Sequence, residues 1–325
     1  MQQFFQLNSP TMSCSVQKLV MTLLLTCFWC NPILADIPIK QAEIYKVRNQ
    51  VDLNRKNQPT WDQAKLGDVI VPQDAVRTGA NSRADILFNE GTLVRTGAET
   101  TFRFPPGKRS FELTSGAALI MIRPQQGQST INTPEAKVVS QGTALFVQHN
   151  NKSRSSLIGV LTDSPAGLVK VSSANGKVTI KLQAGQFVSI VNGVVGLVEN
   201  FVLPMFYETV ELAAGLGTGQ SAMVAQESPE VQATITAVQA EAIDPLTNQI
   251  AWLGGFCQLS AETENLSSLL PLLGFGQPGA KVNLVLPETD LSVIPFRSLS
   301  AVTWLGNYCQ KNQTPPKLNP DNKLK

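Results

Sequence analysis

The pentapeptide Val76-Arg77-Thr78-Gly79-Ala80 recurs, residue for residue, as Val94-Arg95-Thr96-Gly97-Ala98, 18 positions further along the chain. A weaker copy, Leu113-Thr114-Ser115-Gly116-Ala117, follows 19 positions later. Each of the two exact copies precedes a few polar residues and then a strand-like stretch, and the weaker copy leads directly into an apolar stretch. A strand–turn–strand unit of about 20 residues favours stacked rungs that bury their apolar faces on one another, as in a β-solenoid or roll. The alternative is a β-sandwich in which two similar hairpins share a turn sequence.

The residues around these copies have the pattern of strands. Apolar and polar residues alternate at 84–88, 101–104, 111–113 and 177–182. Period-2 alternation places one face of each strand in a core and the other in water. Residues 117–122 are apolar throughout, which is typical of a strand covered on both faces. Turn sequences such as Asn175-Gly176 separate the runs. The pattern predicts an all-β, solenoid- or roll-like domain over residues 36–203.

The first 35 residues have the pattern of a secretory signal peptide. Lys18 is their single charged side chain, and the apolar run 19–30 follows it. This run is shorter than the roughly 20 apolar residues that span a bilayer. We expect cleavage between Ala35 and Asp36, and therefore a periplasmic or extracellular protein without a transmembrane segment in its mature chain. An uncleaved N-terminal anchor is the alternative.

Cleavage at this position removes three of the five cysteines. Cys257 and Cys309 remain. In an exported chain, these two residues are expected to form one disulfide bond, and two buried free thiols are the alternative. Two cysteines and one distant histidine are too few for a structural zinc site.

Composition argues against an enzyme. Charged residues make up only 15% of the chain, and His149 is its one histidine. We place His149 in a solvated loop just after a strand. The sequence has no H-E-x-x-H, P-loop or G-x-S-x-G motif, so we expect no catalytic residues, no cofactor and no metal site. The net charge of +2 predicts no nucleic-acid partner.

Charge and composition divide the chain near Pro204. Residues 36–204 carry a net charge of +6, whereas residues 205–325 carry −5. The second part matches no known pattern, but Ser228-Pro229-Glu230 begins a good amphipathic helix, with Ser as N-cap and Pro at the first helical position. We therefore expect residues 204–325 to be a partly helical region with a mobile tail.

At several positions the strand-rich part resembles the FecR domain family over roughly residues 40–200. The segments that carry this resemblance are Lys65-Leu66-Gly67-Asp68, Val76-Arg77-Thr78-Gly79-Ala80, Glu90-Gly91-Thr92-Leu93-Val94-Arg95 and Ser140-Gln141-Gly142-Thr143-Ala144-Leu145-Phe146-Val147. The resemblance implies an all-β, solenoid-like module outside the cytoplasm and supplies no catalytic residues. Well-known members of the family control a sigma factor through a cytoplasmic segment. We expect no such segment here, because the residues before the β region have the pattern of a leader.

Arg77 and Arg95 occupy equivalent positions in the two pentapeptides. If the rungs stack, the two side chains form a basic ladder that could hold an anionic glycan or an acidic loop of a partner protein. Solvated charges that protect a strand edge are the alternative. The sequence thus predicts a non-enzymatic binding or sensing module of the bacterial envelope that engages another envelope protein. A structural or glycan-associated cell-wall protein is the second hypothesis, and a hydrolase with an unrecognised site is the third.

Overall fold

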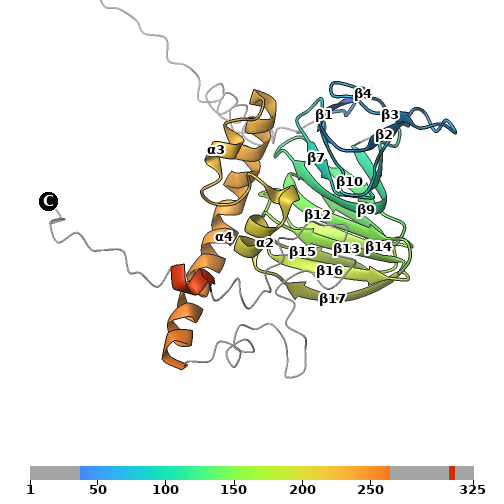
Figure 1. Ribbon diagram of the computed structural model, residues 1–325. Helices are drawn as coiled ribbons and strands as arrows, with labels where there is room; N and C mark the ends of the chain where they lie inside the picture. Colours follow the sequence, from blue (N-terminus) through green and yellow to red (C-terminus); the bar gives the residue numbers. More distant parts are fainter. Residues whose placement is uncertain (1–36, 108, 264–306, 312–325) are drawn as a thin grey trace, which may run out of the picture. The chain divides into compact units, whose positions relative to one another are not determined.

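The computed structural model of the protein describes residues 37–107, 109–263 and 307–311 (Figure 1). The predicted leader, the predicted mobile tail and the residue Asp36 lie outside the described residues. All of the described residues belong to one compact unit. Among the described residues, no helix combines the length and the apolarity needed to cross a bilayer.

Most strands belong to one of two sheets, and β9 (Ser110–Ile122) belongs to both. Sheet A has, in spatial order, β4 (Val69–Ile70), β1 (Ala42–Arg48), β6 (Arg83–Phe88), β7 (Leu93–Thr96), β9, β12 (Thr143–Asn150), β13 (Ser155–Val160), β16 (Gln186–Val191) and β17 (Val194–Asn200). Sheet B has β3 (Asp62–Gln63), β2 (Val51–Asn54), β5 (Ala75–Thr78), β8 (Thr101–Arg103), β9, β10 (Ser129–Asn132), β11 (Ala136–Ser140), β14 (Val169–Ser173) and β15 (Thr179–Leu182).

Strand β9 passes from sheet B to sheet A at Gly116. Ser115 pairs with Thr101 in sheet B, and the next residue, Gly116, pairs with His149 in sheet A. Gly116 has a φ of +80°, and a Cβ atom there would lie 2.5 Å from the Cα atom of Thr100. Only glycine satisfies both the left-handed backbone and this close approach.

The apolar side chains form two clusters on opposite faces of sheet A. The first cluster lies between the two sheets and includes Val76, Ile120 and Val171. The second lies between the outer face of sheet A and the helices, and includes Leu119 and Phe206. In β9, alternate residues enter alternate clusters, which confirms the prediction that residues 117–122 are covered on both faces.

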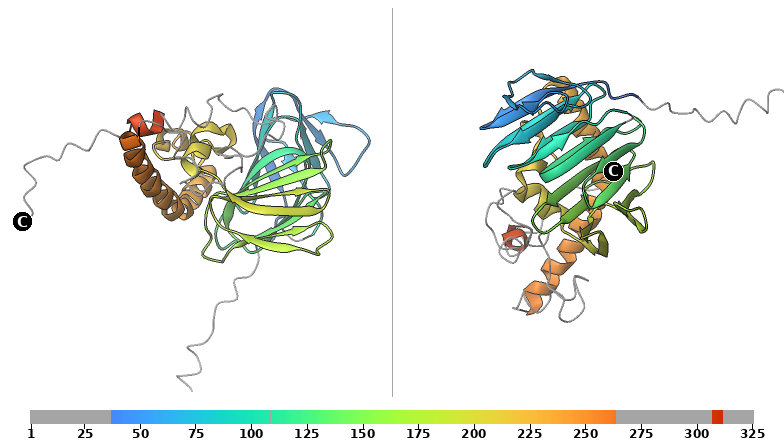
Figure 2. Two further views of the ribbon diagram at one scale, coloured as in Figure 1. Left: turned by 90° about the horizontal axis from the view of Figure 1, so that it is seen from below. Right: turned by 90° about the vertical axis from the view of Figure 1, so that its right-hand side faces the viewer.

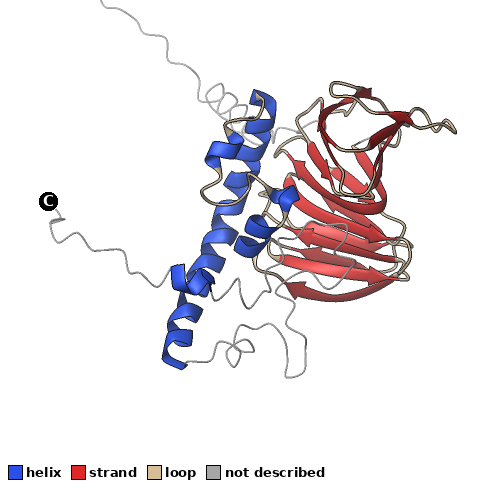
Figure 3. Cartoon of the chain, viewed as in Figure 1, coloured by secondary structure: helices blue, strands red, loops and turns tan. Residues whose placement is uncertain are grey.

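The helices cover the outer face of sheet A on one side of the molecule (Figures 2 and 3). They are α2 (Leu203–Thr209), the 3₁₀-helix η2 (Glu211–Ala213), α3 (Ser221–Val224) and the long α4 (Pro229–Thr263). Helix α4 begins at the proline predicted to occupy its first position, and Val231, Ile235 and Val238 face the sheet cluster. Strand β17 ends at Asn200 and helix α2 begins at Leu203, and residues on both sides of this change share the second cluster.

The protein is therefore mostly β-sheet with few helices, as predicted, and its sheets are not closed into a barrel. The solenoid or roll type is not confirmed. All strand pairs except β9–β10 are antiparallel, whereas rungs stacked in one orientation would pair in parallel. The two copies of the repeated pentapeptide also lie in different sheets, because β5 belongs to sheet B and β7 to sheet A.

Candidate functional site

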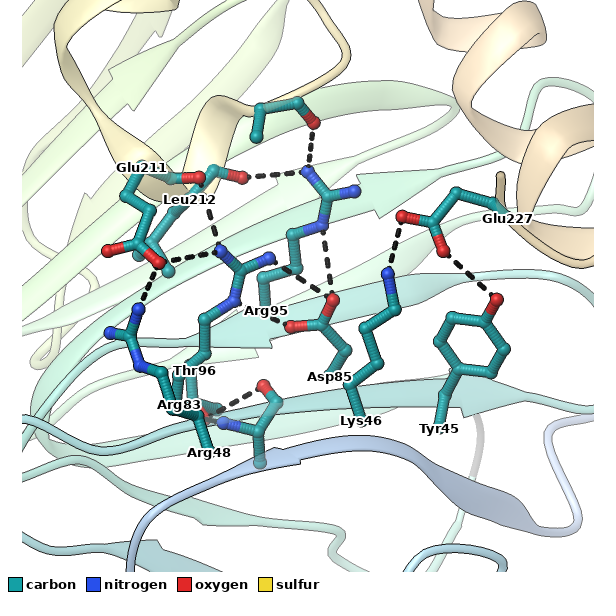
Figure 4. A network of polar contacts seen from close by, with 12 residues as sticks. Tyr45, Lys46, Arg48, Arg83, Asp85, Arg95, Thr96, Glu211, Leu212 and Glu227 are labelled. Carbon is teal, nitrogen blue, oxygen red and sulfur yellow. Dashed lines mark hydrogen bonds and ion pairs between the residues drawn. The ribbon is translucent and has the colours of Figure 1, made fainter. Parts of the chain in front are cut away.

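The most polar part of the buried interface between sheet A and the helices lies on β6 and β7. These strands form a hairpin in which Asp85 pairs with Arg95, so their side chains are cross-strand neighbours on the outer face of sheet A. Arg83, two residues before Asp85, points to the same face. The result is a row of two arginines and one carboxylate below the helices (Figure 4).

Arg83 and Arg95 share the carboxylate of Asp85. The Arg83 guanidinium donates two hydrogen bonds to it, at 2.8 and 3.1 Å, whereas the nearest nitrogen of Arg95 lies 3.5 Å away. Although burial opposes the charge of Arg83, Asp85 holds its pKa above the usual value. Burial lowers the pKa of Arg95, because its weaker contact with Asp85 does not offset the loss of hydration.

Arg95 also binds the helical segment directly. Its Nη1 atom donates a hydrogen bond of 3.0 Å to the carbonyl oxygen of Leu212 and a second one to that of Ala214. These carbonyls lie at the end of η2, where backbone acceptors have no partner within the helix. The Arg95 side chain is only 2% exposed. It therefore attaches the turn after η2 to the middle of sheet A.

Three more ion contacts surround this buried group. Lys46 binds Glu227 at 2.6 Å, and the hydroxyl of Tyr45 donates to the same carboxylate at 3.0 Å (Figure 4). Arg48 pairs with Glu211, which also lies 3.5 Å from Arg83. Each contact joins a strand of sheet A to a residue of the helical region, more than 120 positions later in the chain.

A cleft of about 450 Å³ lies beside this network. Its polar lining includes Arg83, Arg95 and Glu227, and its apolar lining includes three side chains that are unusually exposed for their type. These are Val47 (37% exposed), Leu66 (70%) and Met223 (49%). A concave surface that combines exposed apolar groups with fixed charges is suited to binding a ligand or a partner segment. This cleft is the candidate functional site.

The structure does not bring the two predicted site residues together. Arg77 lies in sheet B, with its guanidinium 4.5 Å from the ring centre of Trp61 and 2.8 Å from Asp52. Its side chain is 44% exposed, in contrast to that of Arg95. The basic ladder is therefore wrong, because the repeated turns direct one arginine to solvent and the other into an internal interface. A role of either residue in binding a partner stays a prediction.

The expected position of His149 is also wrong. It belongs to β12 and is buried, and not in a solvated loop. Its ring nitrogens lie 2.9 Å from the hydroxyl of Ser156 and 2.9 Å from the side-chain oxygen of Asn151. Burial lowers its pKa, so the ring is held as a neutral hydrogen-bonding group of the sheet.

Cys257, in α4, and Cys309, in the short helical segment 307–311, are joined by a disulfide bond with a Cα–Cα distance of 5.1 Å. Among the described residues, no group of three or more histidine, cysteine or acidic side chains could hold a metal ion.

Sequence reasoning missed Tyr45, Lys46, Asp85, Glu211 and Glu227 as members of a site. One signal was available: Asp85 and Arg95 are equidistant from the turn at Glu90, so a hairpin centred there places them opposite each other. The contacts to Glu211 and Glu227 had no such signal, since they depend on how the helices pack.

The structure is that of a β-sheet protein in which helices cover one face of sheet A and a cleft lies beside the buried polar network. Comparison with known proteins is more specific: the model of the family described as FecR protein matches residues 74–164. The resemblance to the FecR family is thus confirmed over the segment from β5 to the end of β13, which includes the hairpin with Asp85 and Arg95.

Two crystal structures of a candidate anti-sigma factor from Parabacteroides distasonis are also similar to this chain. They are 20% and 19% identical to it, each with a TM-score of 0.34. Each similarity covers 39% of this chain and 59% of the solved chain, so this chain matches little more than half of those proteins. No curated protein matches the sequence.

Proposed function

We propose that this chain is an exported, non-enzymatic protein of the bacterial envelope that binds another envelope component, as a sensing or regulatory module. The observation that carries this proposal is the FecR match over residues 74–164. The matched segment supplies Arg83 and Arg95, which line the cleft, and Asp85, which pairs with Arg83. The leader-like residues 1–35 are consistent with a position outside the cytoplasm.

The cleft is the proposed contact site. Its exposed apolar side chains, Leu66 and Met223, come from the loop before β4 and from α3, so a partner there would contact both the sheet and the helical cover. Exposed apolar groups beside fixed charges are typical of surfaces that bind other proteins. The finer fold type, a roll-like FecR-type module of antiparallel strands, is part of the same proposal.

The test is site-specific photo-cross-linking in cells. A photoreactive amino acid replaces Leu66 in the cleft or, as a matched control, Leu168, which is 49% exposed but does not line the cleft. We expect a protein partner to be captured from position 66 and not from position 168. Mass spectrometry then identifies that partner, and the same spectra report whether the mature chain begins at Asp36. Equal capture from both positions would contradict the proposed contact site.

A structural or glycan-associated role in the cell wall is the second candidate. The observation in its favour is the pair Trp61 and Arg77, in which an aromatic ring just before β3 lies 4.5 Å from a partly exposed cation on β5. The substitution Arg77→Ser should then reduce retention on anionic polysaccharide and leave cross-linking at position 66 unchanged. Capture of wall material without a reproducible protein would favour this second role.

A further inference from the structure

Sheet B has an outer face that the proposed protein contact at the cleft does not use. Helices α2, α3 and α4 pack against sheet A, on the opposite side of the molecule (Figure 2). One apolar residue from each of β11, β14 and β15 enters the core between the sheets: Val138, Val171 and Leu182. Because side chains alternate along a strand, the preceding residues, Lys137, Lys170 and Lys181, point outward, and all three are exposed. We call these three residues the lysine cluster.

The pairing of the strands brings the lysine cluster together. Lys170 of β14 pairs directly with Lys181 of β15. Lys137 of β11 pairs with Ser172 of β14, so it lies diagonally across from Lys170. Directly opposite side chains of an antiparallel pair have Cβ atoms about 4.5–5.5 Å apart, and diagonal neighbours are about 7–8 Å apart. Three ammonium groups therefore share one patch on three adjacent strands.

No carboxylate compensates these charges. The ion pairs formed among the described residues include none of the three lysines. The other outward positions of β10, β11, β14 and β15 are uncharged: Thr130, Asn132, Val139, Ser172 and Thr179. Glu135, two residues before Lys137, is buried and binds Arg154. Like charges directly opposite each other destabilise a sheet, so the cluster has a cost that an anionic ligand would remove.

Protection of a sheet edge explains only one of the three lysines. Lysines on edge strands prevent pairing with another sheet, and Lys181 lies on β15, the last strand of sheet B. In contrast, β11 and β14 each pair with a strand on both sides. The other half of the same face has charges of both signs, with Arg77 bound to Asp52 and Arg103 opposite Glu112. Uncompensated positive charge is thus confined to the half that contains the lysine cluster.

We propose that the lysine cluster binds an anionic polysaccharide, whose acidic groups neutralise the three ammonium groups. Hydroxyl and amide side chains lie among the lysines and can form hydrogen bonds with sugar hydroxyls: Thr130, Asn132, Ser172 and Thr179. The one apolar side chain at the outward positions of these strands is the half-buried Val139. A lipid surface or a protein interface would also contact apolar side chains, so this composition favours a polysaccharide.

This inference goes beyond the protein contact at the cleft. It shares with the proposed function only the position outside the cytoplasm. It also differs from the second candidate role in its site, because Arg77 is already bound to Asp52 and lies on β5, in the other half of the sheet.

The test measures binding of the purified full chain to immobilised alginate, to dextran sulfate and to neutral dextran at low ionic strength. One variant replaces all three residues of the lysine cluster by glutamine. We expect it to bind both acidic polymers about tenfold more weakly than the natural chain, since exposed ion contacts are weak one by one and three of them are lost. Replacement of the same three residues by arginine should preserve binding. Neutral dextran should not bind, and high salt should weaken binding to the acidic polymers.

The matched control removes the same total charge elsewhere. Lys40→Gln, Lys65→Gln and Lys152→Gln together change three exposed lysines that lie outside the strands of sheet B. We expect this control to change the affinity for alginate by less than about twofold, because exposed charges at a distance are screened. Equal losses in the two triple variants would overturn the proposal, since binding would then depend on net charge alone.

Stability gives a second readout that does not depend on the polymer. Lys170→Glu converts the like-charged pair with Lys181 into an oppositely charged pair. This variant should unfold at a higher temperature than the natural chain and should bind alginate more weakly. A lower unfolding temperature would contradict the repulsion from which the ligand is inferred.

Three further results would overturn the proposal. The first is that the natural chain binds neither alginate nor dextran sulfate. The second is stronger lysine-dependent binding to phosphatidylglycerol vesicles than to either polymer, which would make the face a membrane contact. The third is a loss of polymer binding on Arg77→Ser without a loss in the triple glutamine variant, which would place the polymer at Trp61. Partner capture at position 66 is independent of all these results.

Discussion

The two arginines of the repeated pentapeptide should differ strongly in their contribution to stability. Arg95→Met replaces the buried guanidinium by an apolar side chain of similar length, and Arg77→Met makes the same change at the equivalent, exposed position. The sequence gives no reason to expect different effects, so the pair is a direct test of the structure.

The expected cost follows from the contacts. Arg95→Met removes two hydrogen bonds from a buried cation to the carbonyls of Leu212 and Ala214, each worth about 1.5–3 kcal/mol. Asp85 keeps its two bonds from Arg83, so no carboxylate is left without a partner. The loss is partly offset because a poorly hydrated charge is also removed. We expect a net loss of about 2–4 kcal/mol.

Arg77→Met should cost about 1 kcal/mol or less. Its ion pair with Asp52 and its contact with Trp61 lie at the surface, where such interactions contribute little. Urea unfolding of both variants, with the disulfide intact, measures the difference. Equal losses for the two variants, or a loss below about 0.5 kcal/mol for Arg95→Met, would refute the assignment of Arg95 as the attachment of the helical segment.

Three further predictions concern other parts of the fold. Gly116→Ala should destabilise the protein by more than about 2 kcal/mol, because the new methyl group meets backbone atoms. Gly176 has a similar φ but open space around it, so Gly176→Ala should cost only about 1–2 kcal/mol. Thermal unfolding of the two variants measures this difference. Burial raises the pKa of Glu241 to about 7, so the free energy of unfolding should fall as the pH rises from about 4.5 to 7. Glu241→Gln should flatten this pH dependence when it is measured by urea unfolding. A variant with the same pH profile as the natural chain would contradict the raised pKa of Glu241. Cys257 and Cys309 are 52 positions apart, so reduction of their disulfide bond should lower the stability by about 4 kcal/mol in the chain-entropy model. A chain that unfolds identically with and without reductant would show that this loop closure contributes nothing.

Much of the β region could be predicted because strand formation depends on local alternation. The strands at 84–88, 101–103 and 179–182 lie where the pattern placed them. The repeated pentapeptide also keeps one local function: the hydroxyls of Thr78 and Thr96 both donate to backbone carbonyls, at 2.6 and 3.0 Å. Its copies nevertheless lie in different sheets, because the chain crosses between sheets after β5 and turns back within one sheet after β6.

The candidate site could be predicted only in part. Asp85 and Arg95 lie opposite each other in a short hairpin, and this cross-strand pair follows from the sequence. The carbonyls that Arg95 binds are 117 and 119 residues away, and no local pattern encodes that contact. His149 was misplaced for a related reason: its polar neighbours suggest a loop, whereas its burial results from pairing with Ser156 across the sheet.

The attachment of β1 to the residues before α4 has a consequence for biosynthesis. Tyr45 and Lys46 are made early, but their partner Glu227 follows 182 and 181 residues later. The segment that covers sheet A, residues 203–246, follows all the strands in the chain, so it is the last of these parts to become available as the chain folds from its N-terminus. Until it docks, an apolar face with Leu119, Met121 and Phe146 has no cover. The strands alone therefore form an aggregation-prone intermediate, and the order of the elements along the chain makes its lifetime depend on the docking of the helices.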